Sequence, residues 1–253
     1  MSGMGRIFQG AATVDSILRG DLIEAAADAG LRSVFVGFES LETANLEQSN
    51  KKQNIGRDYR WAINRLHDLG IMINGSFVFG LDGDTPDVFQ KTVGWAVENG
   101  ITTATFHIAT PYPDTGFFRS ITDAGRLLTD NWDLYDTRHV VFQPKQISAR
   151  VLKEGYDLAY EEFYRWNSIV RSSLFHGTVK HQLKHFFYAG GWKKFEPLWN
   201  IVIQLKKLNL MTPLLEGILS EVTRSSGQEQ PQREPDAARH WNLEPLKEHG
   251  SCP

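Results

Sequence analysis

Cysteine is almost missing from this chain: its 253 residues include a single one, Cys252, next to the C-terminus. A disulfide within the chain is therefore excluded, and so is any metal site that needs three cysteine ligands from this polypeptide. Long apolar runs are missing as well, because no stretch approaches the ~20 residues of a membrane-spanning helix. The N-terminal run MSGMGRIFQGAATVD contains no apolar core of a signal peptide, so we expect a cytoplasmic protein.

Neither positive nor negative charge is in large excess. The chain has 27 basic and 30 acidic residues, a formal net charge of −3, which gives no strong signal for nucleic-acid binding. Lysines alternate with aromatic residues over positions 180–207, a pattern that would suit a nucleic acid or a membrane surface. Aromatic rings packed inward with lysines in water explain the same pattern more simply, and we favour that interpretation.

Short apolar runs alternate with helical stretches from residue 11 to about residue 108. The strand-like runs are 11–14, 33–40, 71–80 and 101–110. Gly30, Gly70 and Gly100 each stand between a helical stretch and a strand, where a left-handed helix cap is expected. Alternation with such short connections predicts parallel strands joined by right-handed crossovers, and hence an α/β fold.

The third and fourth predicted strands each have one polar and one apolar face. His107 shares a face with two threonines, and Asn74 and Ser76 share a face on the strand before it. An open sheet covered by helices on both sides favours apolar residues on both faces. We therefore expect the second half of a parallel (β/α) barrel of the TIM-like type, whose interior holds a polar ligand.

Three regions follow from this pattern. Residues 1–145 are predicted to form the partial barrel, 146–223 a C-terminal helical subdomain, and 224–253 a polar, proline-containing disordered tail. Within the helical region we expect one long amphipathic helix over 148–174, and a later break at Pro197 or Pro213.

Four segments then carry a resemblance to a known family. They are GFES at 37–40, SNKK at 49–52, GSFVFGLDGDT at 75–85 and TPYPDTG at 110–116. In order and spacing they resemble the second half of the core of a radical S-adenosylmethionine (radical SAM) enzyme. The closest likeness is to members that carry a cobalamin-binding domain upstream and a small helical extension downstream. The resemblance covers roughly residues 11–171.

The resemblance implies cofactors that this chain does not fully provide for. Family members bind a 4Fe–4S cluster through a C-x3-C-x2-C motif, which this sequence lacks. For an intact member it implies SAM, that cluster, cobalamin through an upstream domain, and a reductant such as flavodoxin or ferredoxin. The implied activity is radical-based modification of an unidentified substrate, methylation being one form. We interpret the chain as a C-terminal fragment that is inactive alone because it lacks the cluster half.

The resemblance also implies roles for individual residues around SAM. Glu39 is expected to contact the ribose or aminoacyl end, and Lys51 or its neighbour Lys52 the carboxylate. Gly75 lets the backbone approach the adenine, against which Phe77 or Val78 packs. The remaining predicted cofactor contacts are a lid over the adenine made of Pro111, Tyr112 and Pro113. Where the family usually has glycine, this lid has Asp114.

Substrate-side candidates are the polar residues expected to face the barrel interior. Asp15 stands at the end of the first predicted strand, and Asn74, Ser76 and His107 lie on the polar strand faces. No catalytic residue and no metal ligand is assigned. We interpret Asp82 and Asp84 as turn residues that cap the next helix.

Two other classes of function stay open. The first is a non-catalytic binding or scaffold barrel, or a subunit completed by a partner chain. The second is a β/α-barrel lyase or aldolase that uses Lys51 or Lys52 as a Schiff base, although few strands are visible for it.

Overall fold

The computed structural model describes residues 7–42, 45 and 58–204, with side chains up to residue 193. Met1–Trp199 forms one compact unit, and the second unit, Asn200–Pro253, is described only as far as Gln204. Lys51, Lys52, Cys252 and the predicted tail lie outside the described residues. In the part of the chain that is described, none of the helices combines the length and the apolar character needed to span a membrane.

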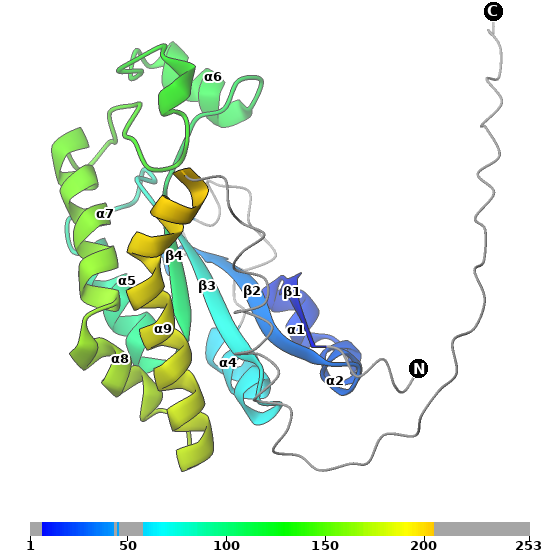
Figure 1. Cartoon of the computed structure of the whole chain (residues 1–253). Coiled ribbons are helices and arrows are strands. Elements are labelled where there is room, and N and C mark those ends of the chain that lie inside the picture. The colour runs from blue at the N-terminus through cyan, green and yellow to red at the C-terminus, as the bar shows by residue number, and fades with distance from the viewer. Residues whose placement is uncertain (1–6, 43–44, 46–57, 205–253) are drawn as a thin grey trace, which may run out of the picture. The chain divides into compact units, whose positions relative to one another are not determined.

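Four parallel strands form one sheet in chain order (Figure 1). They are β1 (Phe8–Ala12), β2 (Leu31–Glu39), β3 (Met72–Phe79) and β4 (Thr103–Ile108). Each strand pairs with its predecessor, as successive strand–helix–strand crossovers require. The expected α/β fold with a parallel sheet is thus confirmed, whereas a TIM-like barrel stays a prediction.

Helices connect and cover these strands. Before β3 they are α1 (Val14–Leu18), α2 (Leu22–Asp28) and α4 (Tyr59–Asp68). After β3 they are α5 (Val88–Glu98), α6 (Gly116–Asp123), the 3₁₀ turn η2 (Trp132–Leu134), α7 (Ala149–Phe163), α8 (Trp166–Ser173) and α9 (Val179–Gln204). The domain boundaries at 145/146 and 223/224 stay predictions.

Local capping signals set where several helices begin and end. The hydroxyls of Thr115 and Ser148 accept hydrogen bonds from the first turns of α6 and α7. The three glycines expected to end helices do so, because Gly30, Gly70 and Gly100 have φ angles of 113°, 66° and 64°.

The main core lies between the strands and the helices α4, α5 and α7. Phe77 of β3 is fully buried between two stacked rings, with centroids 5.5 Å from Phe38 on β2 and 5.8 Å from Phe106 on β4. Trp95 of α5 meets Phe77 edge-on at 6.1 Å. One row of aromatic residues across three strands therefore joins the sheet to its helical layer.

Two tyrosines, Tyr160 in α7 and Tyr164 at its C-cap, satisfy backbone groups on the β4 side of the sheet. The Tyr160 hydroxyl accepts from Phe106 N at 3.1 Å and donates to Phe106 O at 3.2 Å. The Tyr164 hydroxyl does the same at Ala104, at 3.2 and 3.0 Å. These hydroxyls replace the hydrogen bonds that another strand would make, so we do not expect a further strand to pair with β4.

Several predicted elements differ in the structure. The first strand is Phe8–Ala12 and not 11–14, because Thr13 and Ser16 form a capping box that starts α1 at Val14. The predicted helix 148–174 is two helices, since Arg165 is extended between α7 and α8. Of the two positions expected for a later break, Pro197 shows none, since α9 continues to Gln204, and Pro213 lies outside the described residues.

Candidate functional site

The polar face expected from the sequence is present on β3 and β4. Asn74, Ser76, Thr105 and His107 lie on the side opposite the phenylalanine core, and Thr105 Oγ1 donates to Asn74 Oδ1 at 3.2 Å. Ser76 is buried, and the other three are partly buried. The structure thus brings three of the four substrate-side candidates onto one surface of the sheet.

Glu39 lies on the same face of β2, at its carboxyl end. It has a left-handed backbone, with φ of 65°, directly after an irregularity in the pairing of β2 with β3. Its Oε1 lies 2.9 Å from the position that a Cβ on Gly37 would take, so the carboxylate folds back over the strand. The glycine of the GFES segment therefore provides the space that this carboxylate occupies.

His107, near the carboxyl end of β4, contacts Thr137. Its Nδ1 lies 3.2 Å from the hydroxyl of Thr137, and the tautomer determines which of the two donates. Burial lowers the pKa of His107, the negative charge of Glu39 raises it, and Arg138 lowers it further. A neutral imidazole beside a carboxylate can donate or accept a hydrogen bond at pH 7.

Backbone strain gathers at this end of the sheet. Among the described residues other than glycine, positive φ angles occur at Glu39, Asp114 and Thr137, at 65°, 63° and 66°. Glu39 ends β2, Asp114 follows β4, and the Thr137 carbonyl accepts from Ile108 N at 2.7 Å. Such conformations cost about 1–3 kcal/mol each and concentrate at functional sites. The carboxyl ends of β2 and β4 are therefore the candidate site.

Thr137 is the site residue that the sequence did not indicate. It lies thirty residues beyond His107 in the chain, in a segment with no recognisable motif. A β-branched residue is among the least expected to adopt a positive φ, so no local signal predicts this conformation.

The aspartates of the GLDGDT loop, by contrast, make hydrogen bonds and ion pairs that stabilise the fold. Asp84 is only 1% exposed and accepts hydrogen bonds from Gly80 N, Leu81 N and Asn45 Nδ2, at 2.7, 3.1 and 2.6 Å. Burial nevertheless raises its pKa to about 6. Asp82 pairs with Arg126 and Lys145. The interpretation as turn residues holds, but the helix-capping role is wrong, because Asp84 caps its own turn and α5 begins after Asp87.

The predicted adenine contacts divide between two faces. A Cβ on Gly75 would meet Phe77, Ile101 and Phe38, so this residue turns toward the helical core and offers the polar face only its backbone. Phe77 also lies in that core, whereas Val78 lies on the polar face and is partly buried. Of the pair considered for packing against adenine, Val78 is the residue on the side of Glu39.

The predicted lid residues form the turn before α6. Pro111 is buried, Pro113 is exposed and Tyr112 is 46% exposed, while the Tyr112 carbonyl accepts from Thr115 N and Oγ1. Asp114 takes the left-handed conformation for which the family usually supplies glycine. Asp114 therefore adopts the backbone conformation of a tight turn without a glycine. The cofactor roles of these residues stay predictions.

Asp15 does not lie where the sequence suggested. It belongs to the first turn of α1 and pairs with Arg19 at 2.8 Å. The expected place at the end of a strand is wrong, because the capping box at Thr13 starts the helix before residue 15 is reached. Lys51, the predicted contact to the SAM carboxylate, lies outside the described residues.

The left-handed turn at Asp114 can be tested by a pair of substitutions. We expect Asp114→Gly to be more stable than Asp114→Ala by about 1 kcal/mol, since only glycine adopts this φ without a steric penalty. The side chain of Asp114 is exposed, so packing changes little in either variant. Urea unfolding measures the difference, and equal stabilities would show that the residue is not left-handed in solution.

The amino-acid sequence of the chain is similar to those of several known proteins. No family model matches the chain. The bacteriochlorophyllide d C-12(1)-methyltransferase of Chlorobaculum tepidum is 30% identical over 171 residues, which are 68% of this chain and 37% of that protein. The bacteriochlorophyllide d C-8(2)-methyltransferase of the same organism is 29% identical over 159 residues, 60% and 34% of the two chains. The anaerobic magnesium-protoporphyrin IX monomethyl ester cyclase of Cereibacter sphaeroides is 24% identical over 156 residues, 62% and 24%.

Solved structures of one enzyme are also similar. The radical S-adenosylmethionine methyltransferase TsrM from Kitasatospora setae, with tryptophan and the SAM analogue aza-SAM bound, has 20% identity and a TM-score of 0.36, covering 45% of this chain and 22% of that one. Another structure of TsrM holds cobalamin and a 4Fe–4S cluster.

The chain belongs to the radical SAM superfamily, of the type associated with cobalamin, as its four segments predicted. Its relatives are methyltransferases and a cyclase that act on tetrapyrroles, among others. The chain spans only about a third of the length of the first two relatives, 37% and 34%.

Proposed function

We propose that this chain forms the SAM-holding wall of a radical SAM methyltransferase whose cluster-binding part lies outside these 253 residues. The observation that carries the proposal is the convergence of Glu39, His107 and Thr137 at the carboxyl ends of β2 and β4. In parallel β/α folds, ligands bind at this end of the strands.

The residues at this end fit SAM by their chemistry. The Glu39 carboxylate is an acceptor for ribose hydroxyls or for the ammonium of the methionine moiety. Val78 packs partly against the smaller core cluster that contains Leu81 and Phe142, and the rest of its side chain offers an apolar surface to the adenine, which the exposed turn at Tyr112 can cover. SAM, when bound, supplies the transferable methyl group and the source of the radical. The protein residues bind it, orient it and exclude water.

The cluster does not fit the residues of this chain. The sequence has one cysteine, and a 4Fe–4S cluster needs about three or four thiolate ligands. Within the described ranges, no group of three histidine, cysteine or acidic residues is arranged to hold a metal ion. We therefore propose that the ligands come from a separate polypeptide segment.

The two edges of the sheet support a partial barrel that continues on the β1 side. The β4 edge is closed by Tyr160 and Tyr164, as described above. β1 pairs only with β2 among the described strands, and Phe8 is 45% exposed. Further strands of a β/α barrel would therefore add next to β1. Such an enzyme would work in the cytoplasm with a reductant of the flavodoxin or ferredoxin class.

The relatives also suggest which substrate to test first. Both bacteriochlorophyllide methyltransferases and the protoporphyrin cyclase act on planar tetrapyrroles. We propose this class of substrate for the complete enzyme. The chain itself supplies part of the wall that faces it, through Asn74, Ser76 and His107.

Binding of SAM to the chain tests the proposed wall. We expect Glu39→Gln to weaken SAM binding, measured by calorimetry, by about tenfold or more, because a hydrogen bond to a charged group contributes ~1.5–3 kcal/mol. Glu42→Gln is the matched control, since Glu42 lies three residues further on and is exposed. Equal affinities for SAM in the two variants would contradict the role of Glu39.

A separate measurement tests whether the chain alone can bind a 4Fe–4S cluster. After anaerobic reconstitution with iron and sulfide, we expect the chain alone to lack stoichiometric 4Fe–4S absorbance, and an upstream-extended protein that carries a C-x3-C-x2-C motif to gain it. A full cluster in the chain alone would overturn the division between the two parts.

A further inference from the structure

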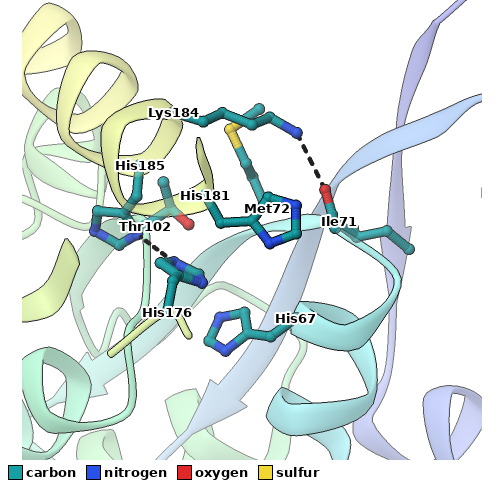
Figure 2. Close-up of a pocket in the computed structure, with 9 residues that line it drawn as sticks. His67, Ile71, Met72, Thr102, His176, His181, Lys184 and His185 are labelled. Carbon is teal, nitrogen blue, oxygen red and sulfur yellow. Dashed lines mark hydrogen bonds between the residues drawn. The ribbon is translucent and has the colours of Figure 1, made fainter. Parts of the chain in front are cut away.

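Four histidines gather at the amino ends of β3 and β4, the opposite end of the sheet from Glu39 and His107 (Figure 2). His67 comes from α4, His176 from the segment before α9, and His181 and His185 from α9 itself. Together with Met72, Thr102 and Lys184 they line a cavity of about 20 Å³. We call these four residues the histidine cluster. It joins α9 to the polar face of the sheet, because Met72 shares that face with Asn74.

The contacts in the histidine cluster are close and largely hidden from water. His176 Nε2 lies 3.0 Å from His185 Nδ1, and the rings of His67 and His176 have centroids 4.6 Å apart. His67 and His185 are 8% and 2% exposed. Within the described residues, Nε2 of His185 has no hydrogen-bond partner, and His67 has only the backbone of Gly100 beside its buried ring. A proton added to His185 Nε2 would therefore be a buried and uncompensated charge, and one added to His67 would be opposed by burial.

The surroundings of His67, His176 and His185 favour neutral imidazoles. Burial, together with repulsion from the neighbouring histidines, lowers the pKa of His67 and of His185 to about 3. It also lowers the pKa of His176, and Lys184 acts in the same direction. At His67 the backbone of Gly100 opposes this effect.

The other charged groups around the cluster carry the same sign as a protonated imidazole. Lys180 and Lys184 belong to α9, and Arg32 on β2 and Lys180 both repel Lys184. Asp68, the residue after His67, is exposed. In the described part of the chain, no carboxylate is among the groups that shift the cluster histidines.

We propose that the histidine cluster is an acid-sensitive latch, which holds α9 on the amino end of the sheet while its imidazoles are neutral and releases α9 when they are protonated. Other contacts in the described part of α9 include a hydrogen bond from Lys184 Nζ to Gly70 O at 3.1 Å and, within the segment itself, one from Gln182 Nε2 to His176 O at 2.7 Å. Further along the helix, Phe186 lies against Trp166 and Lys193 Nζ donates to Tyr164 O. Release would uncover Met72 on the polar face, and Thr102 beside it in the cavity. The proposal does not rest on SAM binding or on any activity.

The sign of the pH dependence follows from linkage. A histidine in the released segment has the ordinary pKa near 6.5, whereas the docked His67 and His185 have pKa values of about 3. The released state therefore binds more protons, so docking is complete above about pH 6.5 and is lost progressively as the pH falls toward 3. Asp84, whose pKa is raised in the folded protein, stabilises the fold as the pH falls, which is the opposite dependence. This contribution is the same in every variant.

Hydrogen exchange by mass spectrometry at pH 7.5 and 5.0, corrected for intrinsic rates, tests the latch. We expect the protection of residues 179–193 to fall by roughly tenfold or more at pH 5.0, while strands β2–β4 change little. In the His67→Phe variant the fall should be several-fold smaller. This substitution removes a titrating ring and its interaction with the backbone of Gly100, and keeps an aromatic ring against Phe175, whose centroid is 5.1 Å from that of His67.

Controls separate the latch from general acid unfolding. His139→Gln changes an exposed histidine that pairs with Asp136, and it should leave the response of α9 as in the unaltered protein. Lys184→Gln, which keeps a donor for Gly70 but removes a charge, should shift the response in the same direction as His67→Phe. The proposal is overturned if His67→Phe responds to acid like the unaltered protein. It is also overturned if α9 and β2–β4 lose protection together.

Discussion

Replacement of Gly155 by alanine is expected to lower the free energy of unfolding by about 1–3 kcal/mol, the usual cost of overpacking a closed core. Gly155 lies on α7 where this helix crosses α5, and a Cβ there would be 2.2 Å from Cε2 of Phe89. Phe89 has little room to move, because it is 3% exposed and meets Phe79 edge-on at 4.8 Å. The absence of a side chain at position 155 thus lets α7 lie against α5.

A second glycine in the same pair of helices is the control. Gly94 lies within α5, and a Cβ there would meet nothing within 4 Å. Gly94→Ala is therefore expected to raise the free energy of unfolding by about 0.5–1 kcal/mol, through the better helix propensity of alanine. Urea unfolding of both variants should give shifts of opposite sign. Shifts of the same sign would mean that α5 and α7 do not meet as described.

The polar face of the strands could be predicted from the sequence, because side chains alternate between the two faces of a strand every residue. His107, Asn74 and Ser76 alternate with apolar residues, and the two-residue repeat of a strand places them on one face without knowledge of the rest of the fold. The same holds for the glycines that end helices, since a left-handed cap is a requirement of a single residue.

The error at Asp15 has a local cause that the sequence did contain. Thr13 and Ser16 have the spacing of a capping box, which starts a helix, whereas the apolar character of residues 11–14 suggested a strand. The hydrogen bonds of the cap decided between the two. Apolar character over four residues does not distinguish a strand end from a first helical turn.

The grouping of distant residues could not be predicted in the same way. Thr137 meets His107 from thirty residues away, and His67 meets His176 across more than a hundred. Both pairings depend on where α9 and the segment after α6 dock, which is a property of tertiary packing. Pro197 suggested a broken helix, and a continuous α9 was not expected.

The two ends of the polar face differ in what they can do. At the carboxyl ends of the strands, Glu39 supplies a carboxylate and His107 an imidazole held by a strained Thr137. At the amino ends, neutral histidines are enclosed under α9 with cations around them. The first arrangement suits a hydroxylated or cationic ligand, whereas the second suits no charged ligand and fits an anchor for a helix.

Adjacent residues of β3 separate the roles of core and site. Phe77 is fully buried between Phe38 and Phe106, so Phe77→Ala is expected to lower the free energy of unfolding by about 3–5 kcal/mol. Val78 is partly buried on the opposite face, and Val78→Ala should cost about 1 kcal/mol. The two substitutions differ in stability because only one of them opens a cavity in the aromatic row.

The two substitutions are expected to affect SAM affinity in the reverse order, with the larger loss in Val78→Ala. Under the proposed function Val78 packs against the adenine, so calorimetry on Val78→Ala should show SAM binding weakened several-fold at a temperature where the protein is folded. Phe77→Ala, measured in its folded state at low temperature, should bind SAM within about twofold of the unaltered chain, because its cavity faces the helices α5 and α7. Loss of SAM binding in Phe77→Ala together with unchanged binding in Val78→Ala would place the adenine on the helical side of β3. The polar face would then have to be given up as the SAM wall, even if the stability changes agree with the structure.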